Sequence, residues 1–144
     1  MDMIRSPKLI FLTATLSILV ALSTHAQITN VLIFKTSFPF YAGNAKMPAG
    51  EYRVTQPNAN APVLLIESES GSHSAFVDFN PTTSEQPHPQ SDVTFNKYGG
   101  VDFLNLLWVQ EQNYGMQVLT TKHEESLAKT ATVQKHTVPI KSAK

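Results

Sequence analysis

The chain contains no cysteine. This absence excludes disulfide bridges, thiolate catalysis, cysteine-ligated zinc and iron–sulfur clusters. A domain without such cross-links must be held together by its hydrophobic core, and a chain of 144 residues is long enough to form one. Export without disulfides is ordinary for bacterial periplasmic proteins and less usual for small secreted eukaryotic ones.

Charge is sparse and evenly balanced. The 11 basic and 11 acidic side chains give no net charge, and only 15% of the residues are charged. No segment carries the run of basic residues that is typical of a nucleic-acid-binding surface. We therefore expect no nucleic-acid partner.

The N-terminal segment predicts an export signal. Arg5 and Lys8 precede an apolar run, Leu9–Leu22, and small residues lead to an expected cleavage site after Ala26. The run is shorter than the roughly 20 residues of a membrane-spanning helix. We expect residues 1–26 to be a signal peptide, a periplasmic or extracellular location, and no permanent membrane span after cleavage; an uncleaved N-terminal anchor is the alternative.

Alternation of apolar and polar residues dominates the rest of the chain and predicts β-strands. Phe34–Tyr41 alternates in this way, with Pro39 indicating an edge strand or a bulge. Gly99–Gly100 separates two alternating runs, which is typical of a β-hairpin. The expected fold class is all-β, a small antiparallel incomplete barrel or sandwich of about six to seven strands with one short C-terminal helix.

Loops and strand edges give three further expectations. Residues 80–91 hold three prolines and predict an exposed, mobile loop. Pro39 and Pro139 are interpreted as protection of exposed sheet edges. Asp78 and Asp102 each interrupt an apolar strand, so we expect both to face solvent, with a paired acid/base site as the alternative.

The pattern changes near the C-terminus. Thr121 and Glu124 have the spacing of a helix capping box, so we expect a short helix over Lys122–Ala131. The predicted domain organisation is a β-rich domain over residues 27–131, followed by a tail over residues 132–144. For this tail an edge strand and a loose segment are both open.

Two strings resemble a known group of proteins. They are F-P-F-Y-A-G-N-A-K-M-P-A-G-E-Y-R-V from Phe38 to Val54, and F-N-K-Y-G-G-V-D-F-L-N-L-L-W from Phe95 to Trp108. They resemble a group of small exported proteins that is abundant in Acidobacteria and has no established function. The resemblance covers about Phe34 to Lys129. It implies a β-rich exported domain and transfers no catalytic or binding residue.

Catalytic and metal-binding patterns are incomplete. His123 and Glu124 begin like a zinc-protease helix, but Leu127 stands where the second histidine ligand is required. Ser72 and Ser74 place hydroxyls beside the base His73, and Asp78 or Asp102 would be the acid of a triad. Neither serine, however, lies in a G-x-S-x-G elbow. We expect no catalytic residue, no metal, no cofactor and no enzymatic activity.

Aromatic residues are the best candidates for binding. Most are expected to fill the core, but some would line a barrel mouth and hold an apolar ligand or a sugar ring. Tyr41, Tyr98 and Trp108 are the predicted ligand-binding residues, because each has a polar group beside its ring.

Three function classes follow from these observations. The leading prediction is a non-enzymatic binding or interaction module of the cell envelope, whose partner is an envelope protein or a cell-wall component. The alternative is a soluble carrier of a small apolar ligand, which predicts a sizeable cavity. The second alternative is a small hydrolase, which predicts His73 clustered with an acid and a hydroxyl.

Overall fold

The structure is a computed structural model that describes residues 30–142. The expected signal peptide, residues 1–26, lies outside the described residues. The elements, in chain order, are β1 (Leu32–Thr36), β2 (Phe40–Ala42), β3 (Ala45–Met47), β4 (Gly50–Thr55), β5 (Val63–Ser68), β6 (Ser74–Thr83), β7 (Asp92–Tyr98), β8 (Val101–Trp108), β9 (Tyr114–Val118), α1 (Lys122–Ala128) and β10 (Val133–Ser142).

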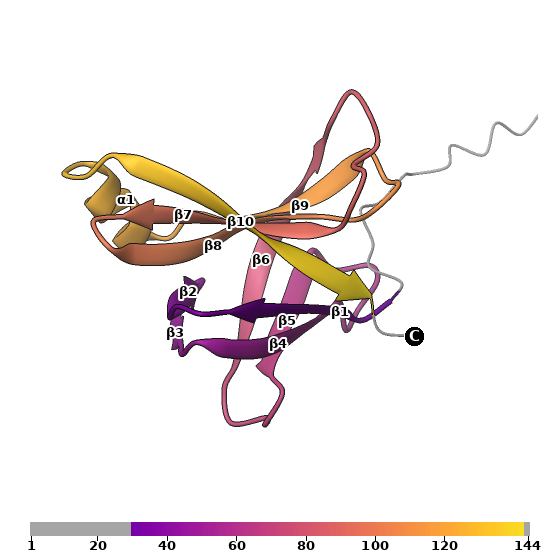
Figure 1. The fold of residues 1–144 in the computed structure, drawn as a ribbon, viewed down its shortest axis with the longest axis horizontal. Coiled ribbons are helices and arrows are strands. Elements are labelled where there is room, and N and C mark those ends of the chain that lie inside the picture. Colours follow the sequence, from indigo (N-terminus) through magenta and orange to yellow (C-terminus); the bar gives the residue numbers. More distant parts are fainter. Residues whose placement is uncertain (1–29, 143–144) are drawn as a thin grey trace, which may run out of the picture.

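Eight of these strands form a closed antiparallel barrel (Figure 1). Their order around the wall is β8-β7-β10-β1-β4-β5-β6-β9, and β9 pairs again with β8 to close the ring. The hairpin of β2 and β3 is not one of the ring strands; it joins the ring where Tyr41 pairs in parallel with Phe103 of β8, and its side chains Phe40, Ala42 and Met47 are buried in the core. The predicted all-β class with one short helix is confirmed, whereas the predicted strand number was too low and the barrel is not incomplete.

Two long strands turn the corners of the barrel. β6 pairs with β5 up to Asp78 and with β9 from Phe79 onward. β10 pairs with β7 up to Pro139 and with β1 from Ile140 onward, and it crosses the molecule diagonally in Figure 1. Because the ring of strands within residues 30–142 is closed and β10 has neighbours on both sides, Pro139 does not lie at a barrel edge, and its interpretation as edge protection was wrong.

The tail forms a strand of the barrel wall, between β7 and β1. Residues 133–142 form β10, which has barrel neighbours on both sides, so the tail is neither loose nor an edge strand. Its sequence gave a weak signal because most of its side chains face solvent and Ile140 is its one buried residue. The expected domain boundary at residue 131 therefore does not separate two parts of the fold.

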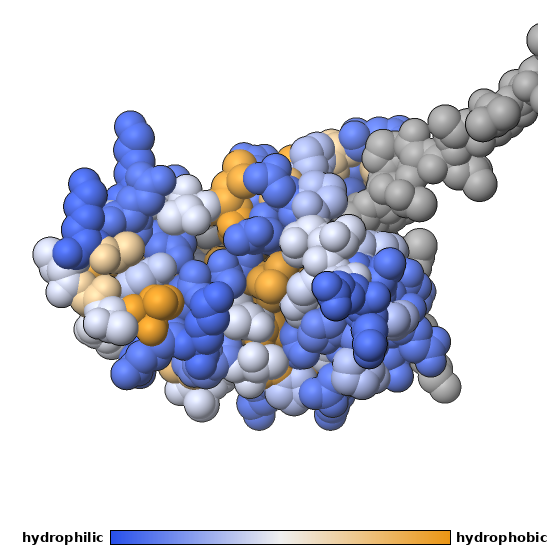
Figure 2. Space-filling view, turned by 90° about the horizontal axis from the view of Figure 1, so that it is seen from above, coloured by the Kyte–Doolittle hydropathy of each residue, from blue (hydrophilic) through white to orange (hydrophobic). Residues whose placement is uncertain are grey.

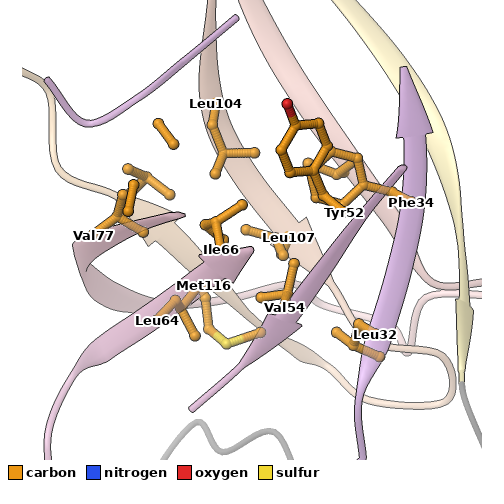
Figure 3. Close-up of a cluster of buried hydrophobic side chains, with 14 of the residues drawn as sticks. Leu32, Phe34, Tyr52, Val54, Leu64, Ile66, Val77, Leu104, Leu107 and Met116 are labelled. Carbon is orange, nitrogen blue, oxygen red and sulfur yellow. The ribbon is translucent and has the colours of Figure 1, made fainter. Parts of the chain in front are cut away.

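Side chains fill the barrel interior. Leu32, Val54, Leu64, Ile66 and Leu107 are almost completely buried and converge from opposite walls (Figure 3). Burial of each such side chain contributes roughly 1.5–3 kcal/mol to folding. The aromatic residues Phe34, Phe40, Tyr52 and Phe95 pack against one another in the same core.

Several local predictions are confirmed. The hairpin turn at Gly99–Gly100 has positive φ at both glycines, 54° and 88°. The helix begins after Thr121, whose hydroxyl oxygen accepts a hydrogen bond from the Glu124 N–H at 3.2 Å. The helix is shorter than predicted and ends at Ala128.

Two other local predictions were wrong. The expected single strand over Phe34–Tyr41 is broken between β1 and β2, so Pro39 lies in a connection and protects no edge. The expected mobile loop over residues 80–91 begins instead as paired strand, because β6 continues to Thr83. The remainder is held to the β8–β9 turn, where the His88 N–H donates to the Gln112 carbonyl at 3.0 Å.

Figure 2 shows one face of the molecule, on which hydrophilic residues predominate and hydrophobic residues surface in small patches. Over residues 30–142, no helix has the length and apolarity needed to cross a bilayer.

Candidate functional site

The candidate site lies where two neighbouring regions of the barrel wall diverge. β9 pairs with β6 only from Phe79 onward and with β8 only from Leu106 onward. The first halves of β6 and β8 are therefore not joined by β9, and the β2–β3 hairpin lies between them, where Ala42 is buried. The turn of this hairpin packs close to β6, because a Cβ built on Gly43 would lie 3.4 Å from Val77 Cγ1.

An open groove of about 400 Å³ runs along this divergence. We call it the β6 groove. Its walls are the hairpin turn at Gly43–Asn44, the strand segment Phe76–Asp78, and the connection Val118–Lys122 between β9 and α1. The volume falls within the roughly 300–1,000 Å³ typical of small-molecule sites.

Phe76 is the prominent apolar group of the β6 groove. Its side chain is 69% exposed, although the residue lies within a barrel strand, near the start of β6. Ala75 and Val77 on either side point into the core, so the alternation of the strand turns Phe76 outward. Leu119, which is 44% exposed, lines the same groove. Exposed apolar groups gathered at a hollow are typical of contact sites.

Polar side chains surround this apolar surface. Asn44, Asp78, Thr120 and Lys122 line the groove, and among residues 30–142 none of their side chains has a hydrogen-bond or ion-pair partner. Thr121 differs, because its hydroxyl caps the helix. The groove therefore places an aromatic ring beside donors and acceptors that are free to meet a ligand.

The predicted ligand-binding residues are divided between two places. Tyr41 and Tyr98 both contact the ring of Phe103, with centroid distances of 5.3 Å and 6.0 Å. They meet on the outer face of β8, where Tyr41 also touches His123 of the helix at 4.9 Å. Trp108 lies at the far end of β8 and stacks on His88 at 4.4 Å. The structure thus brings two of the three together and separates the third from them.

Glu124 connects the Tyr41–Tyr98 cluster to the helix. Its carboxylate is buried and accepts hydrogen bonds from Asn96 Nδ2 at 3.2 Å and from the Tyr98 hydroxyl at 3.3 Å. Burial of Tyr98 raises the pKa of its phenol, and the neighbouring Glu124 carboxylate raises it further. These contacts hold α1 against β7 and leave the Tyr98 hydroxyl engaged within the fold.

A pair formed by the buried carboxylate of Asp102 and the imidazole of His136 lies on the inner side of the β7–β8 hairpin. Asp102 is 3% exposed and its Oδ1 lies 2.5 Å from Nε2 of His136. The imidazole stacks on Phe38 at 4.5 Å and is partly open to solvent. The expectation that Asp102 faces solvent was wrong. Its neighbour Phe103 occupies the outer face of this β8 segment, under Tyr41 and His123, so the alternation of the strand turns Asp102 inward. For Asp78, which is exposed, the expectation is confirmed.

The two aspartates do not form a paired-carboxylate site. Asp78 faces outward from β6, whereas Asp102 faces inward from β8 and is bonded to an imidazole.

A second carboxylate near a histidine is that of Asp92, whose Oδ2 lies 3.8 Å from Nδ1 of His88. Burial raises the pKa of Asp92, and His88 offsets part of that rise.

The residues named for a hydrolase lie at the β5–β6 turn. Ser72 Oγ lies 3.1 Å from Nδ1 of His73, and both side chains are exposed. Glu51 and Glu69 line the same shallow depression, yet within residues 30–142 no hydrogen bond or ion pair joins His73 to a carboxylate. The described part of the chain also contains no group of three histidine, aspartate or glutamate side chains placed to hold a metal ion.

Sequence reasoning missed Phe76 as a site residue. A signal was present, because the inward residues Ala75, Val77 and Phe79 leave Phe76 on the polar face of its strand. An aromatic side chain at a position that alternation assigns to solvent is a better pointer to a binding surface than a polar group on its ring.

Comparison of the chain with models of protein families, with curated proteins and with solved structures found no match.

Proposed function

We propose that this chain is a non-enzymatic binding module of the cell envelope and that its ligand occupies the β6 groove. The observation that carries the proposal is Phe76, an aromatic side chain that is 69% exposed within a barrel strand and lines a groove of about 400 Å³. Because this ring is exposed to water, the fold lacks much of the stabilisation, roughly 1.5–3 kcal/mol, that its burial would contribute. Contact with a ligand recovers that free energy.

The other two function classes have less support. A carrier of an apolar ligand needs an interior cavity, and the barrel axis is filled by side chains such as Leu64, Ile66 and Leu107 (Figure 3). A hydrolase needs an activated nucleophile beside an oriented base. Ser72 and His73 are adjacent in sequence on an exposed turn, and in the described part of the chain no carboxylate is bonded to the imidazole.

Co-sedimentation tests the proposal. The full chain is incubated with washed cell envelopes from the organism that encodes it, and the fraction that pellets is compared for wild type, Phe76→Ala and Val133→Ala. Val133 is the matched control, since it is also an exposed apolar residue (41%) but lies on β10 outside the groove.

We expect Phe76→Ala to weaken envelope binding about tenfold, which corresponds to a loss of ~1.4 kcal/mol, and Val133→Ala to leave it unchanged. Both side chains are exposed, so both variants should keep the wild-type melting temperature within about 2 °C. Equal binding by wild type and Phe76→Ala would overturn the proposal.

A further inference from the structure

We infer that the β6 groove binds a neutral, flat polysaccharide chain built from β-linked glucose-type pyranose rings. This inference rests on the proposed function and names the class of ligand for the same site. It follows from three properties of the groove: one exposed aromatic face, a balanced pair of charges, and hydrogen-bonding groups of both kinds.

The aromatic face fits the apolar side of a sugar ring. A β-linked glucose-type pyranose carries its hydroxyls around the rim and presents C–H bonds on both faces. The face of a phenyl ring is electron-rich and attracts such weakly positive C–H groups. The Phe76 side chain is 69% exposed, which leaves its ring open to such a contact, and Leu119 adds a second apolar side chain to the groove.

Hydrogen-bonding groups line the same groove as Phe76. Phe76 and Asp78 are both on the outer face of β6, two residues apart, which separates their Cα atoms by about 7 Å. Asp78 accepts hydrogen bonds only, Lys122 donates only, and Asn44 and Thr120 do both. Sugar hydroxyls both donate and accept, so they match this set.

The charges favour a neutral ligand. Among residues 30–142, Asp78 and Lys122 are the charged side chains that line the groove, and they have opposite signs. The two charges offset each other, so neither an anionic nor a cationic ligand gains a net electrostatic attraction. A purely apolar ligand would remove both charges from water without replacing their hydrogen bonds, which is costly.

A protein partner fits less well. The centres of protein interfaces are depleted of charged residues, whereas the β6 groove has Asp78, Lys122 and the amide of Asn44 around its aromatic anchor. The groove is open to solvent rather than enclosed, which suits an extended chain better than a buried monosaccharide.

Isothermal titration of the full chain tests the ligand class. The probes are cellohexaose and chitohexaose, which are flat β-linked chains, and maltohexaose, which has the same glucose units in a coiled α-linked chain. We expect at least one flat probe to bind and maltohexaose to bind at least tenfold more weakly. Phe76→Ala should weaken binding of the flat probe about tenfold, and Val133→Ala should change it less than twofold.

Asp78→Asn provides a second variant. It keeps the size of the side chain but replaces an acceptor-only group with an amide, and because Asp78 is exposed the fold should be unaffected. We expect it to weaken the flat probe severalfold and to leave the melting temperature unchanged.

The outcomes separate the inference from the proposed function. If envelope binding depends on Phe76 but neither flat probe binds at millimolar concentration, the polysaccharide class is overturned and the binding module stands. If maltohexaose binds as well as the flat probes, the flat-chain class is likewise overturned. If Phe76→Ala changes neither envelope binding nor probe binding, both proposals fall.

Discussion

The pair formed by Asp102 and His136 gives a sharp test of how the barrel closes. Asp102 lies on β8 and His136 on β10, the strand supplied by the C-terminal tail. The carboxylate is 3% exposed, and the imidazole at 2.5 Å is its hydrogen-bond partner. The pair therefore connects β10 to β8, which is not its direct neighbour in the wall.

The perturbation is His136→Phe. The new ring keeps the stack on Phe38, where the imidazole centroid lies at 4.5 Å, but has no nitrogen to pair with Asp102. Removal of one partner from a buried pair leaves an uncompensated charge and usually costs about 3–5 kcal/mol. Since His136 is partly exposed, water reaches part of the site, and we expect the low end, about 3 kcal/mol.

Asp102→Asn is the complementary change. It removes the buried charge, and the partly exposed imidazole can still bind water, so we expect a loss of about 1 kcal/mol. In the double variant no charge is left unpaired. The combined loss should therefore be smaller than the sum of the two single losses by at least 1 kcal/mol, as is typical of residues in direct contact.

The assay is urea unfolding of the four proteins followed by the fluorescence of Trp108, the single tryptophan of the chain. His73→Ala is the matched control, because that histidine is exposed on a turn and its loss should change stability by no more than about 0.5 kcal/mol. Strict additivity of Asp102→Asn and His136→Phe, or a His136→Phe loss no larger than that of His73→Ala, would refute the reasoning.

Two further changes test the packing and the titration of the barrel wall. Gly115→Ala should lower the free energy of unfolding by about 1–3 kcal/mol, because a Cβ there would lie 2.8 Å from the Leu107 carbonyl oxygen and from Trp108 Cε3. Urea unfolding measures the loss, and Gln117→Ala, on the exposed face of the same strand, is the control. An unchanged unfolding midpoint for Gly115→Ala would contradict the close packing. Tyr98→Phe should lower stability at neutral pH by about 1 kcal/mol, since the hydroxyl that bonds Glu124 is lost. Because burial and the Glu124 carboxylate raise the folded-state pKa of Tyr98 above the usual tyrosine value of 10.0, wild type should lose this advantage as the pH rises above 10.0. A difference between the two proteins that stays constant across that range would be inconsistent with the raised pKa.

Local structure followed from the sequence wherever neighbouring residues decide it. The Gly99–Gly100 turn needs positive φ at both positions, which glycine permits, and Thr121 lies three residues before the N–H that it caps. The outward position of Asp78 also followed, because strand alternation assigns it to the face opposite Val77. These features depend on spacing over a few residues, which the sequence displays directly.

The closure of the barrel did not follow from the sequence. Residues 132–144 alternate weakly and include Pro139, so they gave no clear strand signal. Residues 133–142 form β10 because β7 and β1 both offer unpaired backbone groups on the two sides of the gap that β10 fills. Backbone hydrogen bonding between distant segments is insensitive to side-chain pattern, which is why local periodicity did not predict this strand.

The candidate site shows the same division. The sequence by itself determined that the chain folds as an antiparallel β domain with a short capped helix, and that Phe76 lies on the polar face of its strand. Only the tertiary structure decided that β6 and β8 diverge, that Asn44 and Lys122 line the resulting groove with Phe76, and that Asp102 meets His136 inside the wall. The physical reason is that these residues come from segments far apart in the chain, and their meeting depends on the pairing order of the whole barrel.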